Sequence, residues 1–576
     1  METQLILVPQ EKIAAFTESG WWGALTLDDY FRANTARFNH RVAVVDAPNR
    51  EAFTDGAPRS LSWIDLEKEV TQLCRVLVQD GLTKDDIIIM QLPNCVEQFV
   101  VYMSCARLGV IVTPLPIQYR KHELKHVLSR TSAKAVITCR RIGNHAHAAM
   151  FSALGAELPH QLSVYAFSMP GGVLPEGAQA LDLRMSLAVD GSQLDDYLSH
   201  SQVSANDVFS ICWTSGTEAM PKGVPRSHNE WLVLGPTAIE SANLSQGSRM
   251  LCPFPLVNMA GISVGLCAWL MLGGTVVQHQ PFNLEVFLGQ LREERIDYTI
   301  AAPAILAQLL HKEDLVKGID FVKLNTIGSG SAPLSPWLVA GFKDRFGVDI
   351  VNHFGSNEGA SLTTSPKDVP DPSNRARYFP RPGAQGIKWH VSTTRKVSTR
   401  LVDLDTGIDI TSPGQVGELR YAGATIFSGY FNDPELTSNA FDDKGFYKTG
   451  DLFELGGENN EFYRYAGRSK DVVIRGGMNI SSEEVENLIL AHPQVSEIAV
   501  VGYPDEAMGE RLCACIVPHL GEKLTLEELK KFLLNHQQVA FYKIPERLLL
   551  MEKLPRNPVG KILKRILREQ VQTYVQ

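Results

Sequence analysis

The sequence lacks an excess of basic residues. Its 55 Lys and Arg residues are outnumbered by 64 Asp and Glu residues, which gives a formal net charge of -9. General nucleic-acid binders usually carry a basic excess. This balance therefore argues against that class, and we expect no nucleic-acid partner. It leaves room for a local basic pocket that holds phosphates.

Long apolar runs are also missing. The most apolar stretch, Gly261 to Val277, carries no charge, but Gly273-Gly274 interrupts it. It is also shorter than the roughly 20 residues that a membrane-spanning helix needs. We therefore expect a buried helix followed by a strand here, and no transmembrane segment in the chain.

The nine cysteines are scattered without the spacing of a metal site. Cys513 and Cys515 alternate within an apolar segment, which predicts a strand with both sulfurs packed on one face. His145 and His147 could suggest a metal, but a polar helix edge is expected because further ligands are missing. Reduced thiols suit a cytosolic protein, and the first twenty residues lack the basic start and clean apolar core of a secretory leader. We therefore expect a cytoplasmic protein.

Helix-like and strand-like segments alternate over most of the chain. Strands are predicted at Ile87–Leu92 and Val110–Pro114, and a helix is predicted at Val96–Arg107. This alternation predicts an α/β fold with buried sheets. The 576 residues are enough for roughly two to four domains.

A change of pattern comes late in the chain. Ser481-Ser-Glu-Glu484 reads as a capping box that opens a helix, which Pro493 ends. Thr525 to Glu528 opens a second helix. We predict a large N-terminal α/β domain of several subdomains at residues 1–466. A small mobile α+β domain follows at residues 467–576, with a hinge near Lys470.

The strongest chemical signal is the segment from Trp213 to Val224 (WTSGTEAMPKGV), which an apolar run from Val208 enters as a predicted strand. Glycine lets the backbone approach a ligand closely, and hydroxyls and backbone N–H groups can surround phosphate oxygens. Lys222 adds a positive charge. The segment therefore predicts a polyphosphate-binding loop. It is not a Walker loop, because it lacks the G-x-x-x-x-G-K-[ST] pattern.

Further motifs follow this loop in order. They are Gly328–Leu334 (GSGSAPL), His353–Gly359 (HFGSNEG), Tyr447–Asp451 (YKTGD), Gly467–Glu486 (GRSKDVVIRGGMNISSEEVE) and Pro555–Lys561 (PRNPVGK). Together with the loop they resemble, in the same order, the motifs of the adenylate-forming superfamily. This superfamily includes acyl-CoA synthetases, aryl-acid adenylating enzymes, peptide-synthetase adenylation domains and luciferases. The resemblance spans nearly the whole chain.

The resemblance implies a site for ATP, Mg²⁺ and coenzyme A. The implied ATP- and AMP-binding residues are Thr214, Ser215, Gly216, Thr217, Glu218, Gly330, Ser331, Ala332, His353, Phe354, Gly355, Ser356, Asn357, Asp451 and Arg468. The implied catalytic residues are Lys561, Glu358 and Lys222, and the implied metal ligands are Glu358 and Thr217. Lys470 is the implied hinge, Gly476 and Gly477 line the implied pantetheine channel, and Asn258 lies in the implied acyl pocket.

The chemistry of these residue types agrees with the implied roles. Attack of a carboxylate on the α-phosphate of ATP brings anions together, so the transition state needs a cation such as Lys561. Glu358 is a hard oxygen ligand suited to Mg²⁺, and Asp451 can accept hydrogen bonds from two ribose hydroxyls. Plainer alternatives are a solvated lysine, a glutamate at a helix start, a turn aspartate and, for Arg468, a surface ion pair.

The sequence departs from the family pattern at two positions. Asn357 stands where threonine is usual, and Asn258 stands where the family often has histidine or an aromatic residue. Asparagine and threonine can both hydrogen-bond phosphate, so we expect activity to survive the change at position 357. Asn258 indicates a polar or unusual acyl pocket, and the plainer alternative is a neutral local substitution. In the basic tail, Lys564, Arg565 and Arg568 are expected on a solvated helix face or in contact with CoA phosphates.

These features predict an ATP-dependent acyl-CoA synthetase that acts in fatty-acid and lipid metabolism. It would convert a short- to medium-chain, alicyclic or related carboxylic acid to acyl-AMP and then to acyl-CoA. The opening Phe16–Leu27 (FTESGWWGALTL) resembles such ligases and also aryl-acid adenylating enzymes. The alternative is therefore an enzyme that adenylates an aryl acid and loads it onto the phosphopantetheine of a carrier protein.

Two other classes rank lower. A non-catalytic nucleotide- or acyl-binding protein would be recognised by loss of Lys561, Glu358 or Asp451, and all three are present. A luciferase-like oxygenase can use the same fold, but no residue calls for it specifically. Whether the protein is a monomer or a homodimer stays open.

Overall fold

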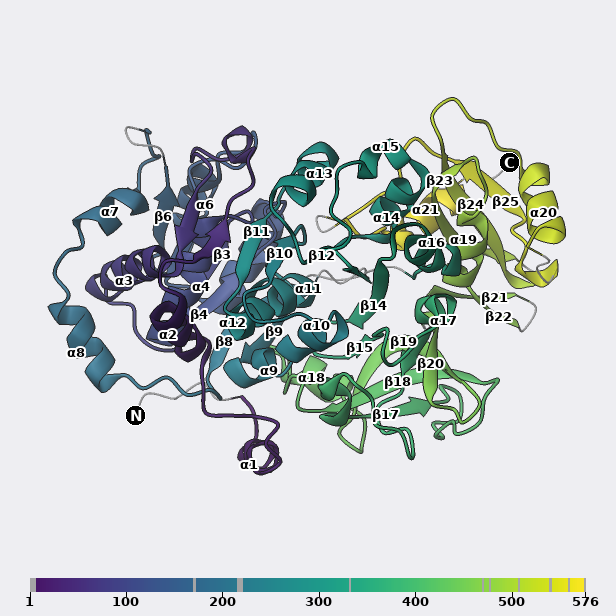
Figure 1. The fold of residues 1–576 in the computed structure, drawn as a ribbon, viewed down its shortest axis with the longest axis horizontal. Helices are drawn as coiled ribbons and strands as arrows, with labels where there is room; N and C mark the ends of the chain where they lie inside the picture. Colours follow the sequence, from purple (N-terminus) through teal and green to yellow (C-terminus); the bar gives the residue numbers. More distant parts are fainter. Residues whose placement is uncertain are drawn as a thin grey trace.

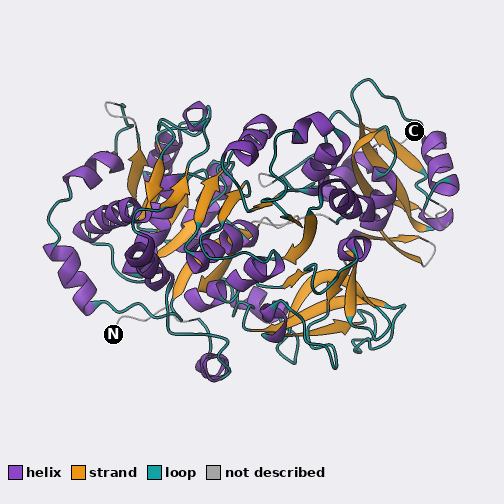
Figure 2. Cartoon of the chain, viewed as in Figure 1, coloured by secondary structure: helices purple, strands orange, loops and turns teal. Residues whose placement is uncertain are grey.

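The computed structural model describes residues 7–168, 172–214, 221–330, 333–468, 471–475, 478–505, 508–537, 541–557 and 560–573. Its strands form four sheets, and helices surround them (Figures 1 and 2). Two large sheets and one antiparallel sheet come from the first 468 residues, and the fourth sheet begins at Val472. The fold is therefore α/β with a large N-terminal part and a small C-terminal part, as predicted.

A seven-stranded sheet is built from the first part of the chain in the order β7-β6-β5-β3-β4-β8-β9. Its strands are β3 (Ile87–Gln91), β4 (Ile111–Pro114), β5 (Ala135–Cys139), β6 (Ser163–Phe167), β7 (Ala178–Ala180), β8 (Val208–Thr214) and β9 (Lys222–Ser227). All pairs are parallel except β8 with β9. Its helices are α3 (Trp63–Gln79), α4 (Val96–Leu108), α5 (Lys121–Thr131), α6 (His147–Gly155), α7 (Leu181–Leu187) and α8 (Ser192–His200). Every residue of β3 and of α4 is buried, as expected where a parallel sheet is covered on both faces.

An eight-stranded sheet has the order β15-β14-β13-β12-β10-β11-β1-β2. Its strands are β1 (Val42–Val45), β2 (Ser60–Ser62), β10 (Arg249–Cys252), β11 (Thr275–Gln278), β12 (Tyr298–Ile300), β13 (Thr326–Gly330), β14 (Asp349–Gly355) and β15 (Ser361–Thr363). The helices of this region and of the N-terminus are α1 (Gln10–Glu18), α2 (Leu27–Phe38), η1 (Arg50–Ala52), α9 (His228–Leu232), α10 (Gly235–Ser241), α11 (Met259–Ile262), η2 (Ser263–Ala268), α12 (Trp269–Leu272), α13 (Leu284–Glu293), α14 (Pro303–His311), α15 (Glu313–Val316), α16 (Pro336–Phe346) and α17 (Pro372–Arg377). The helical run from α11 to α12 followed by β11 confirms the prediction for the most apolar stretch. In the described part of the chain, no helix is both long and apolar enough to cross a membrane.

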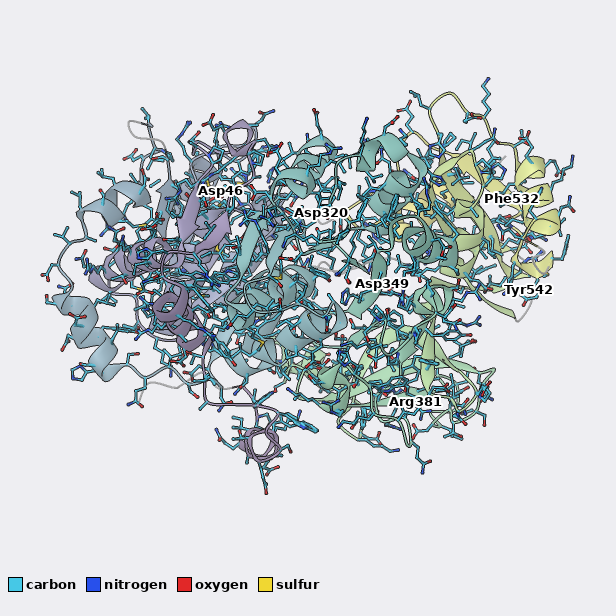
Figure 3. All side chains as sticks on the ribbon, viewed as in Figure 1. Asp46, Asp320, Asp349, Arg381, Phe532 and Tyr542 are labelled. Carbon is cyan, nitrogen blue, oxygen red and sulfur yellow. The ribbon has the colours of Figure 1, made fainter. Side chains whose placement is uncertain are left out.

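Asp46, labelled in Figure 3, links these two sheets by a hydrogen bond. The carboxylate of Asp46, which follows β1, accepts hydrogen bonds from the backbone N–H of Val96 (2.8 Å) and from Arg50 (2.5 Å). Val96 begins α4 of the neighbouring sheet. Burial, together with the nearby charge of Glu97, raises the pKa of Asp46 to about 6.

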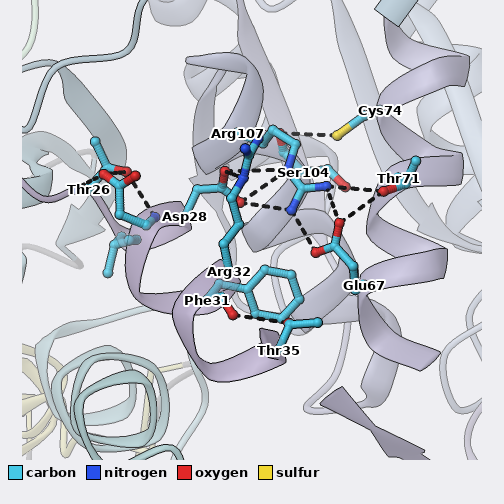
Figure 4. A network of polar contacts seen from close by, with 12 residues as sticks. Thr26, Asp28, Phe31, Arg32, Thr35, Glu67, Thr71, Cys74, Ser104 and Arg107 are labelled. Atoms are coloured by element: carbon cyan, nitrogen blue, oxygen red, sulfur yellow. Dashed lines mark hydrogen bonds and ion pairs between the residues drawn. The ribbon is translucent and has the colours of Figure 1, made fainter. Parts of the chain in front are cut away.

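Three helices beside the seven-stranded sheet are joined by a buried ion network (Figure 4). Arg107 of α4 donates from Nη2 to Asp28 of α2 (3.0 Å) and to Glu67 of α3 (2.7 Å). The planar guanidinium can serve both carboxylates at once. The side chain of Arg107 is 4% exposed, so this network belongs to the core that supports the site.

The third sheet is antiparallel, with the order β16-β20-β19-β18-β17. Its strands are β16 (Tyr378–Pro380), β17 (Val397–Val402), β18 (Val416–Gly423), β19 (Tyr447–Gly456) and β20 (Phe462–Arg468), with η3 (Ser392–Arg395) and α18 (Pro434–Ala440) beside them. Aromatic side chains fill its core, including Phe379, Phe453 and Tyr463. Gly467 and Arg468 still pair with β19, and the predicted boundary between residues 466 and 467 stays a prediction.

The C-terminal sheet has its own apolar core. It contains β21 (Val472–Arg475), β22 (Met478–Ser481), β23 (Val495–Asp505), β24 (Gly509–Pro518) and β25 (Arg547–Leu550), with α19 (Ser482–Leu490), α20 (Leu526–Asn535), η5 (Phe541–Lys543) and α21 (Lys564–Thr573). The hydroxyl of Ser481 accepts from the N–H of Glu484, and Thr525 and Glu528 cap α20 reciprocally, so both predicted helix starts are confirmed. Cys513 and Cys515 are buried on β24 in one core cluster, as predicted, and all nine cysteines are unpaired.

The interpretation of His147 as part of a polar helix edge was wrong. The side chain is fully buried at the start of α6, and its Nδ1 is hydrogen-bonded to Oε1 of Gln91 (2.8 Å). Burial lowers the pKa of His147 to about 3, so the ring stays neutral. Among the residues described, no cluster of three or more His, Cys, Asp or Glu side chains could hold a metal ion.

Candidate active site

A cavity of about 610 Å³ lies where strand ends from the two large sheets meet. β8 ends on its wall at Thr214, β12 at Ile300, β13 at Gly330 and β14 at Gly355. Open α/β sheets bind ligands outside the carboxyl ends of their strands. The antiparallel sheet contributes Asp451 to the wall, and the C-terminal part contributes Lys561.

Every predicted site residue that the structure describes lines this cavity. These residues are Thr214, Lys222, Asn258, Gly330, His353, Phe354, Gly355, Ser356, Asn357, Glu358, Asp451, Arg468 and Lys561. The other predicted residues lie outside the described part of the chain: Ser215, Gly216, Thr217, Glu218, Ser331, Ala332, Lys470, Gly476 and Gly477. Motifs that are far apart in the sequence therefore meet in one place.

Glu358 is held in a fixed orientation. It is 7% exposed, and its Oε1 accepts a hydrogen bond from the hydroxyl of Tyr430 (3.0 Å). The Nζ of Lys222 lies 5.3 Å from the centre of the Tyr430 ring. Within the described residues the other carboxylate oxygen of Glu358 has no hydrogen bond. A buried carboxylate with one oxygen in use and a position on the cavity wall fits a hard divalent cation such as Mg²⁺.

Asp451 lies on β19, in the motif that is predicted to bind ribose, and it lines the cavity. Its carboxylate is paired with Nε of Arg468 (2.9 Å), and its backbone N–H donates to the hydroxyl of Thr449 (3.1 Å). Burial raises its pKa, while the positive charges of Arg468 and Lys561 act in the opposite direction. The Arg468 ion pair is therefore part of the cavity and not a remote surface contact.

Lys561 reaches the cavity from a short turn ahead of α21. Its backbone N–H donates to Oδ1 of Asn557 (2.8 Å), and its carbonyl accepts from the N–H of Asn557 (2.8 Å). Gly560 takes a positive φ of 85°, which glycine adopts without strain. This closed turn directs a cation from the C-terminal part toward the carboxylates of the N-terminal part.

The two departures from the family pattern meet at the same helix. Oδ1 of Asn258 accepts from the N–H of Gly261 (3.2 Å) and caps α11. Oδ1 of Asn357 accepts from the N–H of Met259 (2.7 Å), the first residue of that helix. The amide oxygen of Asn357 is thus engaged by the backbone, and its NH₂ group is the donor that suits a phosphate oxygen.

His353 forms part of the wall beside these residues. Its Nε2 lies 3.2 Å from the hydroxyl of Tyr298, and its Nδ1 is hydrogen-bonded to the hydroxyl of Thr363. Burial lowers its pKa to about 4. The ring is therefore a neutral, fixed wall group at physiological pH, and it adds no charge for the nucleotide phosphates.

The expectation that Lys564 lies on a solvated helix face was wrong, and its contact with CoA phosphates stays a prediction. Its Nζ pairs with Glu486 (2.7 Å) and donates to the hydroxyl of Ser482 (2.7 Å), and its side chain is only 13% exposed. Arg568 pairs with Asp471 (2.6 Å). A lysine is rarely buried unless it is paired with a charged group. The two ion pairs therefore anchor α21 to Glu486 and Asp471 within the C-terminal part. Arg565 is exposed, as expected.

Sequence reasoning missed Tyr430 and Tyr465, and it placed Tyr447 in a motif without giving it a role. Tyr430 and Tyr447 line the cavity, and Tyr465 contacts Asp451 from β20. The sequence shows only that Tyr430 follows a glycine, Gly429. The carboxylate partner of Tyr430 cannot be read from the local sequence.

Comparison with family models gives two matches that together cover most of the chain. Residues 31–431 match the model described as AMP-binding enzyme, and residues 484–561 match the model of the AMP-binding enzyme C-terminal domain. The medium-chain fatty-acid–CoA ligase of Escherichia coli is 29% identical, over 98% of this chain and 93% of that protein. The salicylyl-CoA synthase / salicylate adenylyltransferase of a Streptomyces species is 28% identical, over 98% and 97%.

Solved structures share the fold over nearly the whole chain. ATP-bound MatB from Rhodopseudomonas palustris superimposes with a TM-score of 0.74 at 23% identity, over 95% of this chain and 99% of that chain. The anthranilate CoA ligase AuaEII in complex with anthranoyl-AMP superimposes with a TM-score of 0.76 at 19% identity, over 96% and 98%. At these identities the likeness establishes the architecture alone.

Proposed function

Because the chain belongs to the AMP-binding enzyme family, we propose that it is an acyl-CoA synthetase that uses ATP to join a carboxylic acid to coenzyme A. The acid first attacks the α-phosphorus of ATP, which forms an acyl-adenylate and releases pyrophosphate. The thiol of coenzyme A then attacks the acyl carbonyl, which forms the thioester and releases AMP. The observation that carries this function is the cavity that collects Lys561, Glu358, Asp451 and Lys222 from separate parts of the fold.

In the first step the lysines would counter negative charge. A carboxylate approaching a phosphate raises the local negative charge, and cations fixed near the reacting atoms lower that barrier. Lys561, which lines the cavity, would bridge the carboxylate and the α-phosphate. Lys222 lies over the ring of Tyr430, which donates to Glu358. Asp451 would accept the ribose hydroxyls. Glu358 and Thr217 would hold Mg²⁺, which would neutralise phosphate charge when bound.

In the second step the C-terminal part would rotate about Lys470, remove Lys561 and present Gly476 and Gly477. Hinge rotation of a small domain is ordinary protein mechanics, and glycines let a narrow thiol arm pass close to the backbone. A thiol with an ordinary pKa near 8.5 is partly ionised near neutral pH. Because AMP is a good leaving group, the step needs no dedicated strong base.

The acid that we propose is short- to medium-chain, alicyclic or related. Small and apolar residues line the cavity beside Asn258, among them Ala238, Val257, Met259 and Val264. The Escherichia coli relative is named for medium-chain fatty acids, which agrees with a role in fatty-acid metabolism. The buried, unpaired cysteines support a cytoplasmic location.

A panel of acids tests this function. Purified protein is incubated with ATP, Mg²⁺, coenzyme A and pooled aliphatic, alicyclic and aryl acids, and thioesters are detected by mass. We expect an acyl-CoA whose mass identifies the acid class. Release of pyrophosphate without any CoA thioester, together with loading of a carrier protein, would contradict the proposal in favour of an aryl-acid adenylating enzyme.

A further inference from the structure

Glu483 of α19 meets the antiparallel sheet beside the predicted ribose-binding carboxylate. The helix packs against β20, and Oε1 of Glu483 lies 3.3 Å from the hydroxyl of Tyr465. The same hydroxyl lies 3.4 Å from Oδ1 of Asp451. We propose that Glu483 is a positioning residue, which holds Asp451 through Tyr465 in its protonated form and releases it when ionised. This inference rests on the proposed function.

If Asp451 and Glu483 are both ionised, the three groups share only the hydroxyl hydrogen of Tyr465, and a second proton is needed for both contacts to be hydrogen bonds. The hydroxyl of Tyr465 carries a single hydrogen, which can be donated to only one of the two carboxylates. Asp451 is paired with Arg468 and is therefore the group that stays ionised. A protonated Glu483 can donate from Oε1 to the oxygen of Tyr465 while Tyr465 donates to Asp451, so the phenol can then hydrogen-bond both carboxyl groups at once.

The surroundings of Glu483 favour its protonated form. Its second oxygen, Oε2, is buried and has no hydrogen-bond partner among the described residues. Burial raises the pKa of Glu483 to about 7, the charges of Glu486, Asp451 and Asp471 add to the rise, and the charge of Lys564 opposes it. Arg468 on β20 is also a charged neighbour of Glu483, but its guanidinium is paired with Asp451. Ionised Glu483 would leave a buried carboxylate oxygen without a partner, which is costly.

Tyr465 links this proton to the nucleotide site. Its ring packs on Phe354 at 6.0 Å and on Phe453 at 5.2 Å between ring centres, so its hydroxyl has little freedom. Asp451, Tyr465 and Phe354 belong to the N-terminal part, whereas Glu483 belongs to the C-terminal part that carries Lys561. The contact is therefore made only while Lys561 faces the cavity, and it would be broken by the proposed rotation.

The sign of the pH effect follows from this arrangement. A carboxyl group whose pKa is raised in one orientation stabilises that orientation at low pH and loses this contribution as the pH rises through the raised value. The adenylate-forming orientation is therefore favoured below pH about 7 and weakened above it. At pH 8, about one pH unit above that pKa, adenylation limited by this orientation should be about tenfold slower than at pH 6.

The test is the pH profile of adenylation without coenzyme A, measured by exchange of labelled pyrophosphate into ATP. We expect wild type to lose rate with an inflection near pH 7 and Glu483→Gln to lose that inflection, because the amide keeps the shape but not the ionisation. Glu484→Gln is the matched control. Glu484 is exposed and pairs with Lys543 within the C-terminal part, so its profile should follow wild type.

The possible results separate the inference from the function on which it rests. If wild type shows no pyrophosphate exchange that depends on an added carboxylic acid substrate at any pH, the proposed function fails and the inference fails with it. If wild type exchanges but Glu483→Gln keeps the same inflection, or Glu484→Gln loses it equally, the function stands and the role of Glu483 is wrong. A thermal midpoint for each variant shows that the compared proteins are folded.

Discussion

Tyr430 controls the orientation of Glu358, the acidic residue for which we propose a metal-binding role. The phenol donates to Oε1 from 72 positions further along the chain, and burial raises its pKa, so it remains a donor at all working pH values. Lys222 lies over the same ring. The side chain of Tyr430 therefore contacts the predicted metal ligand through its hydroxyl and Lys222 through its ring.

Removal of this hydroxyl should weaken adenylation. A hydrogen bond to a charged group contributes about 1.5–3 kcal/mol, so we expect Tyr430→Phe to slow pyrophosphate exchange by about tenfold or more and to raise the Mg²⁺ concentration needed for half-maximal rate. The rate is measured over a Mg²⁺ titration at saturating ATP and acid.

Tyr463→Phe is the control for this prediction. Tyr463 is also buried, and its hydroxyl is hydrogen-bonded to the hydroxyl of Thr399 (2.9 Å), but it does not line the cavity. It should leave the Mg²⁺ dependence unchanged. A Tyr430→Phe variant with the wild-type Mg²⁺ requirement would show that the phenol does not orient the metal ligand.

At the scale of elements, α21 depends on a lysine that points inward. The Lys564–Glu486 pair is largely buried, with side-chain exposures of 13% and 16%. Removal of one partner of a buried pair leaves an uncompensated charge and costs about 3–5 kcal/mol. We expect Lys564→Ala to destabilise the C-terminal part by that order, measured by chemical denaturation. Arg565→Ala, on the exposed face of the same helix, should change stability by less than about 0.5 kcal/mol.

A Lys564→Ala variant as stable as Arg565→Ala would contradict the anchoring role. Activity alone does not decide this point, because an unfolded helix would also displace the Lys561 turn. Stability is therefore the readout, and the two neighbouring cations differ mainly in burial.

Local elements were predictable because their signals are local. The apolar run at Ile87 and the buried helix from Val96 were predicted within one residue of β3 and α4, since hydrophobic periodicity and glycine or proline boundaries act over a few residues. The motif residues of the site were also predicted, because their order along the chain resembles that of a family. Their convergence in one cavity required the fold.

Contacts between side chains that are far apart in the sequence could not be predicted. His147 and Lys564 look solvated in the sequence, yet Gln91 and Glu486 bury them from distant positions. Tyr430 and Tyr465 carry no local sign of the carboxylates that they contact. Side-chain direction on a helix or strand depends on which neighbouring element covers it, and one sequence does not contain that information.

At the scale of the whole molecule, the two parts meet through charge. Lys561 faces the cavity from the C-terminal part, and its positive charge acts on Asp451 of the antiparallel sheet. We propose that this arrangement serves adenylation and that thioester formation uses a different orientation of the C-terminal part.

The most direct test of this account measures both half-reactions in wild type and in Lys561→Ala. Adenylation is followed by pyrophosphate exchange, and thioester formation is followed from supplied acyl-adenylate and coenzyme A. Lys553→Ala, which changes an exposed lysine in the same part of the chain, is the control. We predict that Lys561→Ala slows adenylation by about 100-fold or more and affects thioester formation much less. An equal loss in both half-reactions would contradict the assignment of Lys561 to the first step alone.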